Sequence, residues 1–226
     1  MNSLRPSRGE VTRQALLRAA VHLFAEQGVE NTTVRDILAA AGQKNESALH
    51  YHFGGYQGLI EAAQKQWNDA VRIRRGEMLA AWQSAGEAPC LRTLCRIMVQ
   101  PAFELAASDT YHRDFVRAFG HAMALGTEPA LRLARRTEDE SGRTLGNALR
   151  AAMPGLDAFA SRHRLEIALR MCAAAMHHHA GQRSAFRGKP AQIFLLGLLD
   201  ALEALLAAPE SGETRAARSA SGMTHQ

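Results

Sequence analysis

The side chains best suited to chemistry in this chain are hydrogen-bonding groups gathered between residues 33 and 51. The amide of Asn45 can bond adenine in a bidentate way, and the carboxylate of Glu46 can accept from cytosine N4. Ser47 follows directly, so these three residues can present donors and acceptors to base edges. Lys44 suits a phosphate oxygen, while Arg35 can reach a base edge or the backbone. This order of residue types indicates contact with double-stranded DNA.

A helix that ends in a tight turn must carry the first of these groups. The hydroxyl of Thr33 can cap its amino end, with Asp36 as the capping-box partner. Apolar residues then recur at helical spacing, at Val34, Ile37, Leu38 and Ala41. Gly42 tolerates the positive φ that ends a helix, so the chain turns there through residues 43–45.

A second, shorter helix must present the groups that face the bases. The sequence predicts it over roughly Glu46 to Phe53, with Asn45 as its N-cap. A helix of this length is not stable alone, so it must dock on its neighbours. The docking side chains are Ala48, Leu49 and Phe53, and the outward-facing ones are Ser47, His50 and Tyr51. A short, docked helix after a tight turn is how a helix-turn-helix contacts DNA. The alternative, a hairpin buried in an ordinary bundle, would not need polar residues clustered at one end.

Residues 10 to about 60 resemble the DNA-binding domain of the tetracycline-repressor (TetR) family of bacterial regulators. The matching residues are Ala19, Ala20, Leu23, Phe24, Gly28, Thr33, Val34, Ile37, Ala41, Gly42, Tyr51, Phe53 and Leu59. The turn after Gly42 is one residue longer than the commonest family pattern, as in a subgroup with a Gln-(Arg/Lys)-Asn-x-Ser-Ala turn. Many members also place a phosphate-contacting Lys three residues after the Phe, where this chain has Tyr56. Either Tyr56 or nearby Lys65 takes the place of this Lys, or the affinity for DNA is lower.

The resemblance implies a sequence-specific transcriptional regulator that is a repressor by default. Lys44 and Thr33 then contact phosphate, and so does Tyr51 or His50, because the family's usual Tyr falls at the position of His50. The predicted DNA-binding residues are Thr33, Arg35, Lys44, Asn45, Glu46, Ser47, His50 and Tyr51. The alternatives are a helical adaptor that has lost DNA binding and a non-specific DNA-binding protein without effector control.

The composition predicts an all-α fold, because Ala and Leu dominate while Val and Ile are few. We expect an N-terminal three-helix helix-turn-helix domain, followed by a larger helical domain for effector binding and dimerisation. The predicted divisions are a flexible arm at 1–9, the DNA-binding domain at 10–55, the effector domain at 56–208 and a disordered tail at 209–226. Residues 4–8 of the arm could enter the minor groove, or they could be a simple disordered leader.

The charge of the chain agrees with a polyanionic partner without requiring one. The net charge is +5, and residues 1–75 hold ten Lys or Arg against seven Asp or Glu, an excess of +3. In contact with DNA, each neutralised phosphate would make the affinity more sensitive to salt. The alternative is an Arg-rich surface with no partner.

Long helices broken by Pro and Gly fill the remainder of the chain. The pattern predicts helices over Tyr56–Ser84, Cys90–Ala107, Tyr111–Leu125, Pro129–Met153, Leu156–Gly181 and Pro190–Ala208. The last of these is apolar almost all round, which suits burial against a second copy as well as an ordinary core. Two copies related by a two-fold axis would read a palindromic operator with half-sites roughly 34–36 Å apart. The resemblance likewise implies a homodimer that pairs through its last two helices.

The middle helices are the predicted site of a small-molecule effector, as the resemblance implies. Adaptable sulfur and aromatic side chains could line an apolar cavity there, although filled-core positions would have the same composition. The predicted ligand-binding residues are Met98, Phe103, Phe115, Phe119, Met123, Met171 and Met176. Nothing in the sequence identifies the effector.

Other kinds of site have little support. His177, His178 and His179 are adjacent, so on a helix they cannot all face one metal ion, and we predict no metal and no cofactor. No HExxH, GxSxG or phosphate-loop pattern is present, which argues against an enzyme. The chain lacks a signal-peptide h-region and a bilayer-length apolar run, and its three cysteines form no CxxC. We therefore expect a cytoplasmic protein with no membrane partner.

Overall fold

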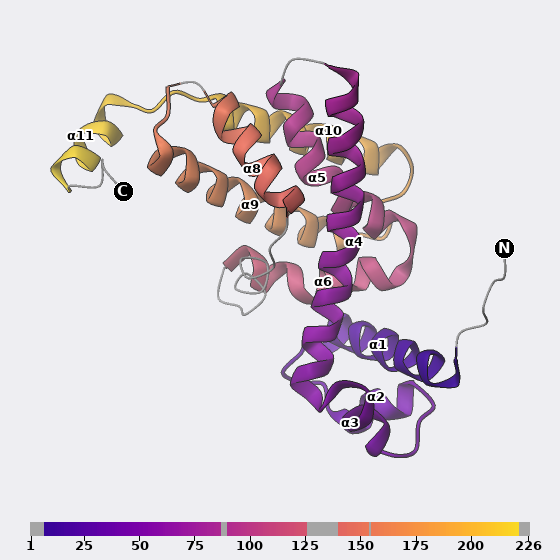
Figure 1. The fold of residues 1–226 in the computed structure, drawn as a ribbon. Coiled ribbons are helices and arrows are strands. Elements are labelled where there is room, and N and C mark those ends of the chain that lie inside the picture. The colour runs from indigo at the N-terminus through magenta and orange to yellow at the C-terminus, as the bar shows by residue number, and fades with distance from the viewer. Residues whose placement is uncertain (1–6, 87–89, 126–139, 154, 222–226) are drawn as a thin grey trace.

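A computed structural model describes residues 7–86, 90–125, 140–153 and 155–221 of the 226-residue chain. Within these ranges the chain forms helices and no strand, so the all-α prediction is confirmed. The helices are α1 (Arg8–Gln27), α2 (Val34–Ala40), α3 (Ser47–Phe53), α4 (Tyr56–Ala85), α5 (Leu91–Ser108), α6 (Thr110–Leu125), α8 (Glu140–Ala152), α9 (Ala158–Ala180), α10 (Gly188–Ala207) and α11 (Gly212–Ala220). Figure 1 shows α1 to α3 at one end of the molecule and the longer helices beyond them.

Most helix bounds lie within two residues of the sequence-based predictions. The predicted helix at Pro129–Met153 corresponds to α8 only from Glu140 onward, and its earlier part lies outside the described residues. Residues 1–6 of the predicted arm also lie outside them, and α1 begins at Arg8 because the Ser7 side chain caps it. The amide of Glu10 donates to the Ser7 hydroxyl at 3.2 Å.

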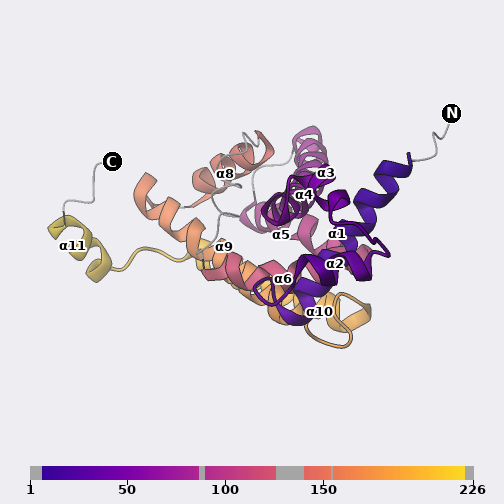
Figure 2. The ribbon, with the colours of Figure 1, turned by 90° about the horizontal axis from the view of Figure 1, so that it is seen from below.

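The three N-terminal helices and the first turns of α4 form a small unit, here called the reading head. Its centre is apolar and fully enclosed, with Leu16, Leu17, Val21, Ile37, Leu49 and Leu59 at or below 1% exposure. Burying a Leu or Ile side chain of this kind contributes about 1.5–3 kcal/mol. The short helices α2 and α3 therefore owe their stability to this shared core (Figure 2).

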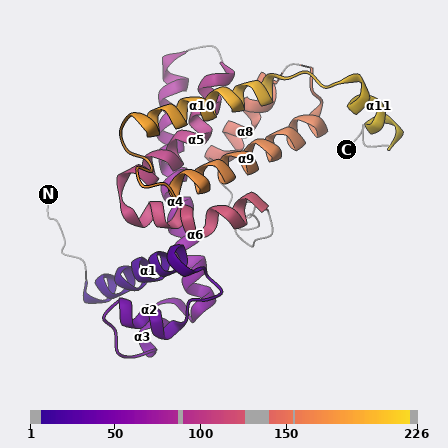
Figure 3. The same cartoon turned by 180° about the vertical axis from the view of Figure 1, so that it is seen from behind.

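The longer helices build the second unit, here called the helical domain. α6 lies along α9, and α5 packs on α10, α4 and α8. Figure 3 shows α9 and α10 side by side on one outer face. The approach of α6 to α9 depends on Gly120, where an added Cβ would lie only 2.8 Å from the Cβ of His177. α4 belongs to both units, since Leu59 is buried in the reading head and Leu79 in the helical domain.

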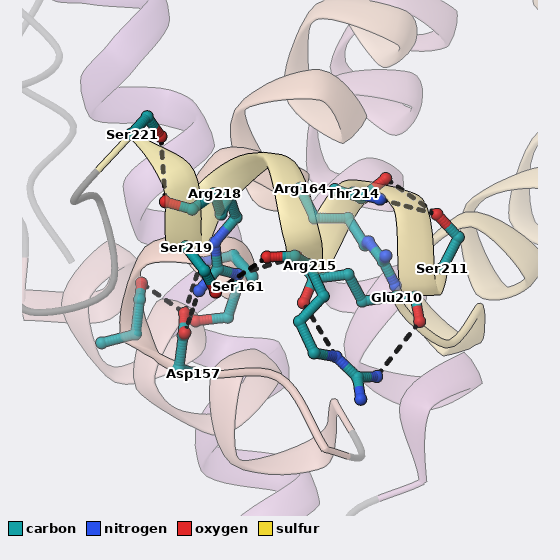
Figure 4. A network of polar contacts seen from close by, with 12 residues as sticks. Asp157, Ser161, Arg164, Glu210, Ser211, Thr214, Arg215, Arg218, Ser219 and Ser221 are labelled. Atoms are coloured by element: carbon teal, nitrogen blue, oxygen red, sulfur yellow. Dashed lines mark hydrogen bonds and ion pairs between the residues drawn. The ribbon is translucent and has the colours of Figure 1, made fainter.

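The C-terminal tail differs from its prediction, because residues 212–220 form helix α11 rather than a disordered end. No α11 residue is buried, and polar contacts hold the helix instead (Figure 4). Arg218 pairs with Asp157 and, at 2.7 Å, with Glu210, while the Ser211 hydroxyl accepts from the Thr214 amide. Periodicity of apolar residues cannot detect a helix that is fixed by caps and ion pairs.

One helix also corrects the expectation about bilayer-length segments. α10 has 20 residues and is long and apolar enough to span a membrane by length and composition alone. This is weak evidence, because core helices of soluble proteins pass the same test. Asp200 and Glu203 interrupt the apolar sequence, and both pair with Arg92 of α5 at 2.6 and 2.9 Å.

Candidate nucleic-acid interface

The capping box at the start of α2 forms as predicted. The Asp36 amide donates to the Thr33 hydroxyl at 3.2 Å, and the Asp36 carboxylate accepts from the Thr33 amide at 3.1 Å. The Thr33 hydroxyl also donates to this carboxylate at 2.6 Å, and these bonds lower the pKa of Asp36. The hydroxyl proton of Thr33 is therefore engaged inside the box, and a phosphate contact from it would require the box to open.

The turn between α2 and α3 holds the predicted base-reading residues. Gly42 has a φ of +66°, the conformation for which glycine is needed there, and the Gln43 amide returns to the Leu38 carbonyl at 2.8 Å. The side-chain oxygen of Asn45 accepts from the Ser47 amide at 2.9 Å. The N-cap residue of α3 is therefore Glu46 and not Asn45 as predicted, because the helix begins at Ser47, one residue later than expected, although the Asn45 side chain still bonds its first amide. The amide NH2 group of Asn45 has no partner within the described residues and stays available to donate.

All eight predicted DNA-binding side chains are exposed on this unit. They are Thr33, Arg35, Lys44, Asn45, Glu46, Ser47, His50 and Tyr51. Tyr51 is 85% exposed, which is unusual for a large aromatic side chain and leaves its ring and hydroxyl free for a partner. The structure therefore places six of them on α3 and its preceding turn, while Thr33 and Arg35 lie at the start of α2.

Two exposed cations of this unit are Arg35 on α2 and Lys44 in the turn before α3. Within the described residues, their side chains make no hydrogen bond and no ion pair. Elsewhere, Arg74 pairs with Glu104 at 2.6 Å and Arg117 pairs with Glu26 at 2.8 Å. Uncompensated positive charge on an exposed helix-turn-helix is suited to attracting a polyanion.

Two residues that the sequence reasoning missed hold α3 in place. The guanidinium of Arg13 lies over the Phe53 ring, 5.4 Å from its centroid. Gly58 lies against the end of α3 so closely that an added Cβ would be 1.8 Å from the Phe53 carbonyl oxygen. Glycine weakens a helix, so its presence in the first turn of α4 is unexpected. This unexpected glycine is the sequence signal that could have predicted the close contact.

Tyr56, one candidate for the place of the family's lysine, makes its contacts within the protein. Its hydroxyl donates to the Val29 carbonyl at 2.6 Å, and its ring packs edge-on against Phe24. Burial raises the pKa of this hydroxyl. Lys65 is not free either, because it pairs with Asp69 at 2.5 Å. The structure thus commits both candidate substitutes to contacts within the protein.

The predicted effector-binding residues fall into separate groups. Phe115 stacks on Trp67 with ring centroids 4.8 Å apart, and Phe119 meets Phe24 of α1 edge-on at 5.9 Å. These two rings therefore fill the junction between the reading head and the helical domain. Phe103 lies elsewhere, against the ring of Phe186 at 5.3 Å. Met98, Met123 and Met171 are half-buried and Met176 is buried in the helical domain. A ligand-binding role stays a prediction for all seven residues.

A polar cluster that the sequence did not reveal joins α1 to α6. The carboxylate of Asp114, only 7% exposed, lies 3.0 Å from the Nδ1 of His22. Arg117 bonds Glu26 on α1 and lies 3.4 Å from the other oxygen of Asp114. Its hydrogen bond lowers the pKa of Glu26. This junction cluster, His22, Glu26, Asp114 and Arg117, ties the reading head to the helical domain.

The three adjacent histidines of α9 serve different purposes. His177 lies near the Val116 carbonyl, His178 is exposed, and His179 is buried with its ring flat on Phe194 at 3.9 Å. The Phe186 amide donates to Nε2 of His179 at 3.1 Å. Among the described residues, no group of three potential ligands gathers around one point.

Comparisons with known proteins agree with this arrangement. Residues 16–63 match the family of bacterial regulatory proteins, tetR family, and residues 96–208 match the tetracyclin repressor-like C-terminal domain. The transcriptional repressor KstR2 of Mycolicibacterium smegmatis is 34% identical over 74 residues, 33% of this chain and 36% of that protein. The repressor AcnR of Corynebacterium glutamicum is 39% identical over 62 residues, 27% of this chain and 31% of that protein. The chain thus matches only about a third of the length of these relatives.

Solved structures resemble the fold over most of its length. The ketosteroid transcriptional regulator KstR2 of Mycobacterium tuberculosis superposes with a TM-score of 0.59 at 19% identity, covering 87% of this chain and 95% of that one. AmtR of Mycobacterium smegmatis superposes with a TM-score of 0.56 at 19% identity, covering 98% of this chain and 97% of that one. Because one family model matches the reading head and another matches half of the chain in the helical domain, the protein belongs to the TetR family of bacterial regulators.

Proposed function

We propose that this protein is a sequence-specific DNA-binding repressor that acts in the cytoplasm as a homodimer on a palindromic operator. The observation that carries the proposal is the exposed surface of α3 and its preceding turn. There, Asn45 and Glu46 present groups suited to base edges, and neither Lys44 nor Arg35 on the neighbouring α2 pairs with another described residue. The related repressors KstR2 and AcnR support it, and so does the tetR family match, whose residues 16–63 include this surface.

The homodimer is supported by the outer face of α10. Its exposed residues recur at helical spacing and are largely apolar or small: Ile193, Leu196, Gly197, Ala201 and Ala204. Ile193 is 70% exposed, and no described side chain comes within 4 Å of a Cβ added at Gly197. A second copy packed here, beside α9, would cover this face and set the distance between two reading heads.

We further propose that a small molecule bound in the helical domain releases the operator. For this, the ligand must bind the conformation that does not fit DNA better than the one that does. The junction cluster supplies a physical connection, because a shift of α6 would move Asp114 and Arg117 relative to His22 and Glu26. Binding and release are therefore expected to depend on the same α1–α6 contact.

A mobility-shift titration on DNA flanking the gene tests the central claim. Binding that falls steeply with salt yet resists excess random competitor is the expected result. In vitro selection of DNA then provides the operator, and a symmetric footprint tests the dimer. If selection recovers no motif, the chain is not a sequence-specific regulator and the helical-adaptor alternative replaces it.

A further inference from the structure

Two histidines from different helices lie close together where α6 meets α9. The rings of His121 on α6 and His177 on α9 have centroids 5.8 Å apart, and their planes are inclined at 47°. Gly120 permits this approach, because a Cβ added there would lie only 2.8 Å from the Cβ of His177. The prediction of no metal rested on the three adjacent histidines of α9, which cannot all face one ion. The fold instead brings one of them to a histidine of another helix.

The surroundings of His177 leave one of its ring nitrogens available to a metal ion. Its Nδ1 lies 3.4 Å from the carbonyl oxygen of Val116. A carbonyl oxygen can only accept, so in the neutral ring Nδ1 carries the proton and Nε2 keeps its lone pair. Metal-binding histidines almost always donate their other ring N–H to an acceptor of this kind, which fixes the tautomer and the orientation of the ring. His177 therefore has the tautomer and the hydrogen bond that are usual for a metal ligand.

The second ring, that of His121, is accessible and lies at a suitable distance. His121 is exposed, and its side chain makes no hydrogen bond or ion pair within the described residues. Two imidazoles that share one ion through metal–nitrogen bonds of about 2.0–2.1 Å have ring centroids about 5.2–6.4 Å apart, from a tetrahedral to a linear arrangement. The observed 5.8 Å lies inside this range. A single ion can therefore bind both rings without a change in the distance between the helices.

The two helices are held in this relation by contacts of their own. Arg170 of α9 donates to the carbonyl oxygen of Leu125, at the end of α6, at 2.9 Å. Arg170 also pairs with Glu166 at 2.7 Å, and Arg117 of α6 pairs with Glu26 at 2.8 Å. Carboxylates thus engage the arginines that flank the histidine pair along both helices, which limits their repulsion of a cation. Ligands on rigid, packed helices are the arrangement that favours metal binding.

We infer that His121 and His177 together bind one divalent transition-metal ion, with water completing its coordination. Imidazole nitrogen suits Zn²⁺, Ni²⁺ and Cu²⁺, and Cu²⁺ binds most tightly of the three. The ion joins α9 to α6, the helix whose Asp114 and Arg117 contact α1 of the reading head. Because it binds only the folded arrangement of the two helices, it also stabilises the fold.

The experiment is a calorimetric titration of the untagged full chain with Cu²⁺, Ni²⁺ and Zn²⁺. The wild type is compared with His121→Ala and His177→Ala, and His178→Ala is the matched control, because His178 is adjacent to the pair and exposed. We expect one ion per chain in the wild type and the control, and an affinity at least about tenfold lower in each variant of the pair, since loss of even an outer partner costs about 10–100-fold. Electron paramagnetic resonance of the Cu²⁺-loaded protein counts the bound imidazoles. Two are expected in the wild type and one in each variant of the pair.

The exposed His121 keeps the test decisive even if loss of the half-buried His177 disturbs the fold. Thermal melts without metal check that each variant is folded. Metal binding that is unchanged in His121→Ala, or that falls equally in His178→Ala, overturns the inference, and so does a wild-type titration that does not saturate at one ion per chain. The proposed function is tested separately on DNA, so failure of the metal site leaves the repressor intact, and failure of selective DNA binding leaves the metal site intact.

Discussion

The reading head and the helical domain differ in how some of their cations are placed. In the helical domain, Arg74 pairs with Glu77 and Glu104, and Arg92 pairs with Asp200 and Glu203. In the reading head, Arg35 on α2 and Lys44 in the turn before α3 make no hydrogen bond or ion pair within the described residues. The paired arginines hold contacts within the protein, whereas the two unpaired cations can bind an anionic partner. This difference supports the proposed DNA-binding surface.

We expect the largest effect on DNA binding from a substitution that displaces α3, not from one that changes the charge of its surface. Gly58→Ala places a methyl group 1.8 Å from the Phe53 carbonyl oxygen, so α3 must shift relative to α4. We expect operator affinity to fall at least about a hundredfold, as when binding groups are displaced by about 1 Å. Gly76→Ala is the matched control on the same helix, because nothing lies within 4 Å of its added Cβ. Equal affinity for the two variants in a mobility-shift titration would refute this role of Gly58.

The second prediction concerns the junction cluster between the reading head and the helical domain. Asp114→Asn removes the buried charge that faces His22 and Arg117, and we expect the free energy of unfolding to fall by about 1–3 kcal/mol. The loss should appear in chemical denaturation, and the affinity for the operator should become less sensitive to the effector once one is known. Asp109→Asn, at the residue just before α6, is a control, because its carboxylate is more exposed and, among the described residues, contacts only His112. A drop of the same size in both variants would show that the junction cluster has no special role.

Two substitutions in the turn before α3 test which residues contact phosphate and which contact bases. Lys44→Ala should weaken binding to all DNA sequences and lower the salt slope by about 1, while Asn45→Ala should relax preference at one base pair by about 1–3 kcal/mol. Both are measured by titration against the operator, against single-base variants of it and against random DNA. If the two variants lose affinity equally on operator and random DNA, this division of roles is wrong.

The smallest effect concerns a buried histidine of the helical domain, His179. Burial lowers the pKa of His179 below its ordinary value of 6.5, with His178 adding to the shift and a hydrogen bond with Gln182 opposing it. The unfolded chain then binds more protons, so stability should be lost as the pH falls below about 6.5, down to the folded-state pKa. Thermal melts between pH 7.5 and 5 test this, with His179→Gln expected to flatten the profile and the exposed His163→Gln on the same helix to leave it unchanged. A wild-type midpoint that does not fall with acidification would contradict the assignment.

Local sequence patterns predicted most of the fold and the outline of the site. The Thr33–Asp36 box, the turn at Gly42 and the exposed face of α3 follow from caps, glycine conformations and apolar spacing, all of which act within a few residues. The junction cluster could not be predicted, because His22 and Asp114 are 92 positions apart and only packing brings them together. The contacts of Tyr56 and of α11 could not be predicted for a related reason, because their partners Val29 and Asp157 are distant in sequence.

The length of α4 has a mechanical consequence. This helix has 30 residues and runs without interruption for about 45 Å, and its lower end packs closely against α3 at Gly58. A tilt of only about 5° at its upper end would move the lower end by about 4 Å over that length. In the proposed dimer, two such helices would tilt in opposite directions, so a small rearrangement among the upper helices would change the distance between the two reading heads. The proposed contact with DNA would then be lost while each reading head keeps its own shape.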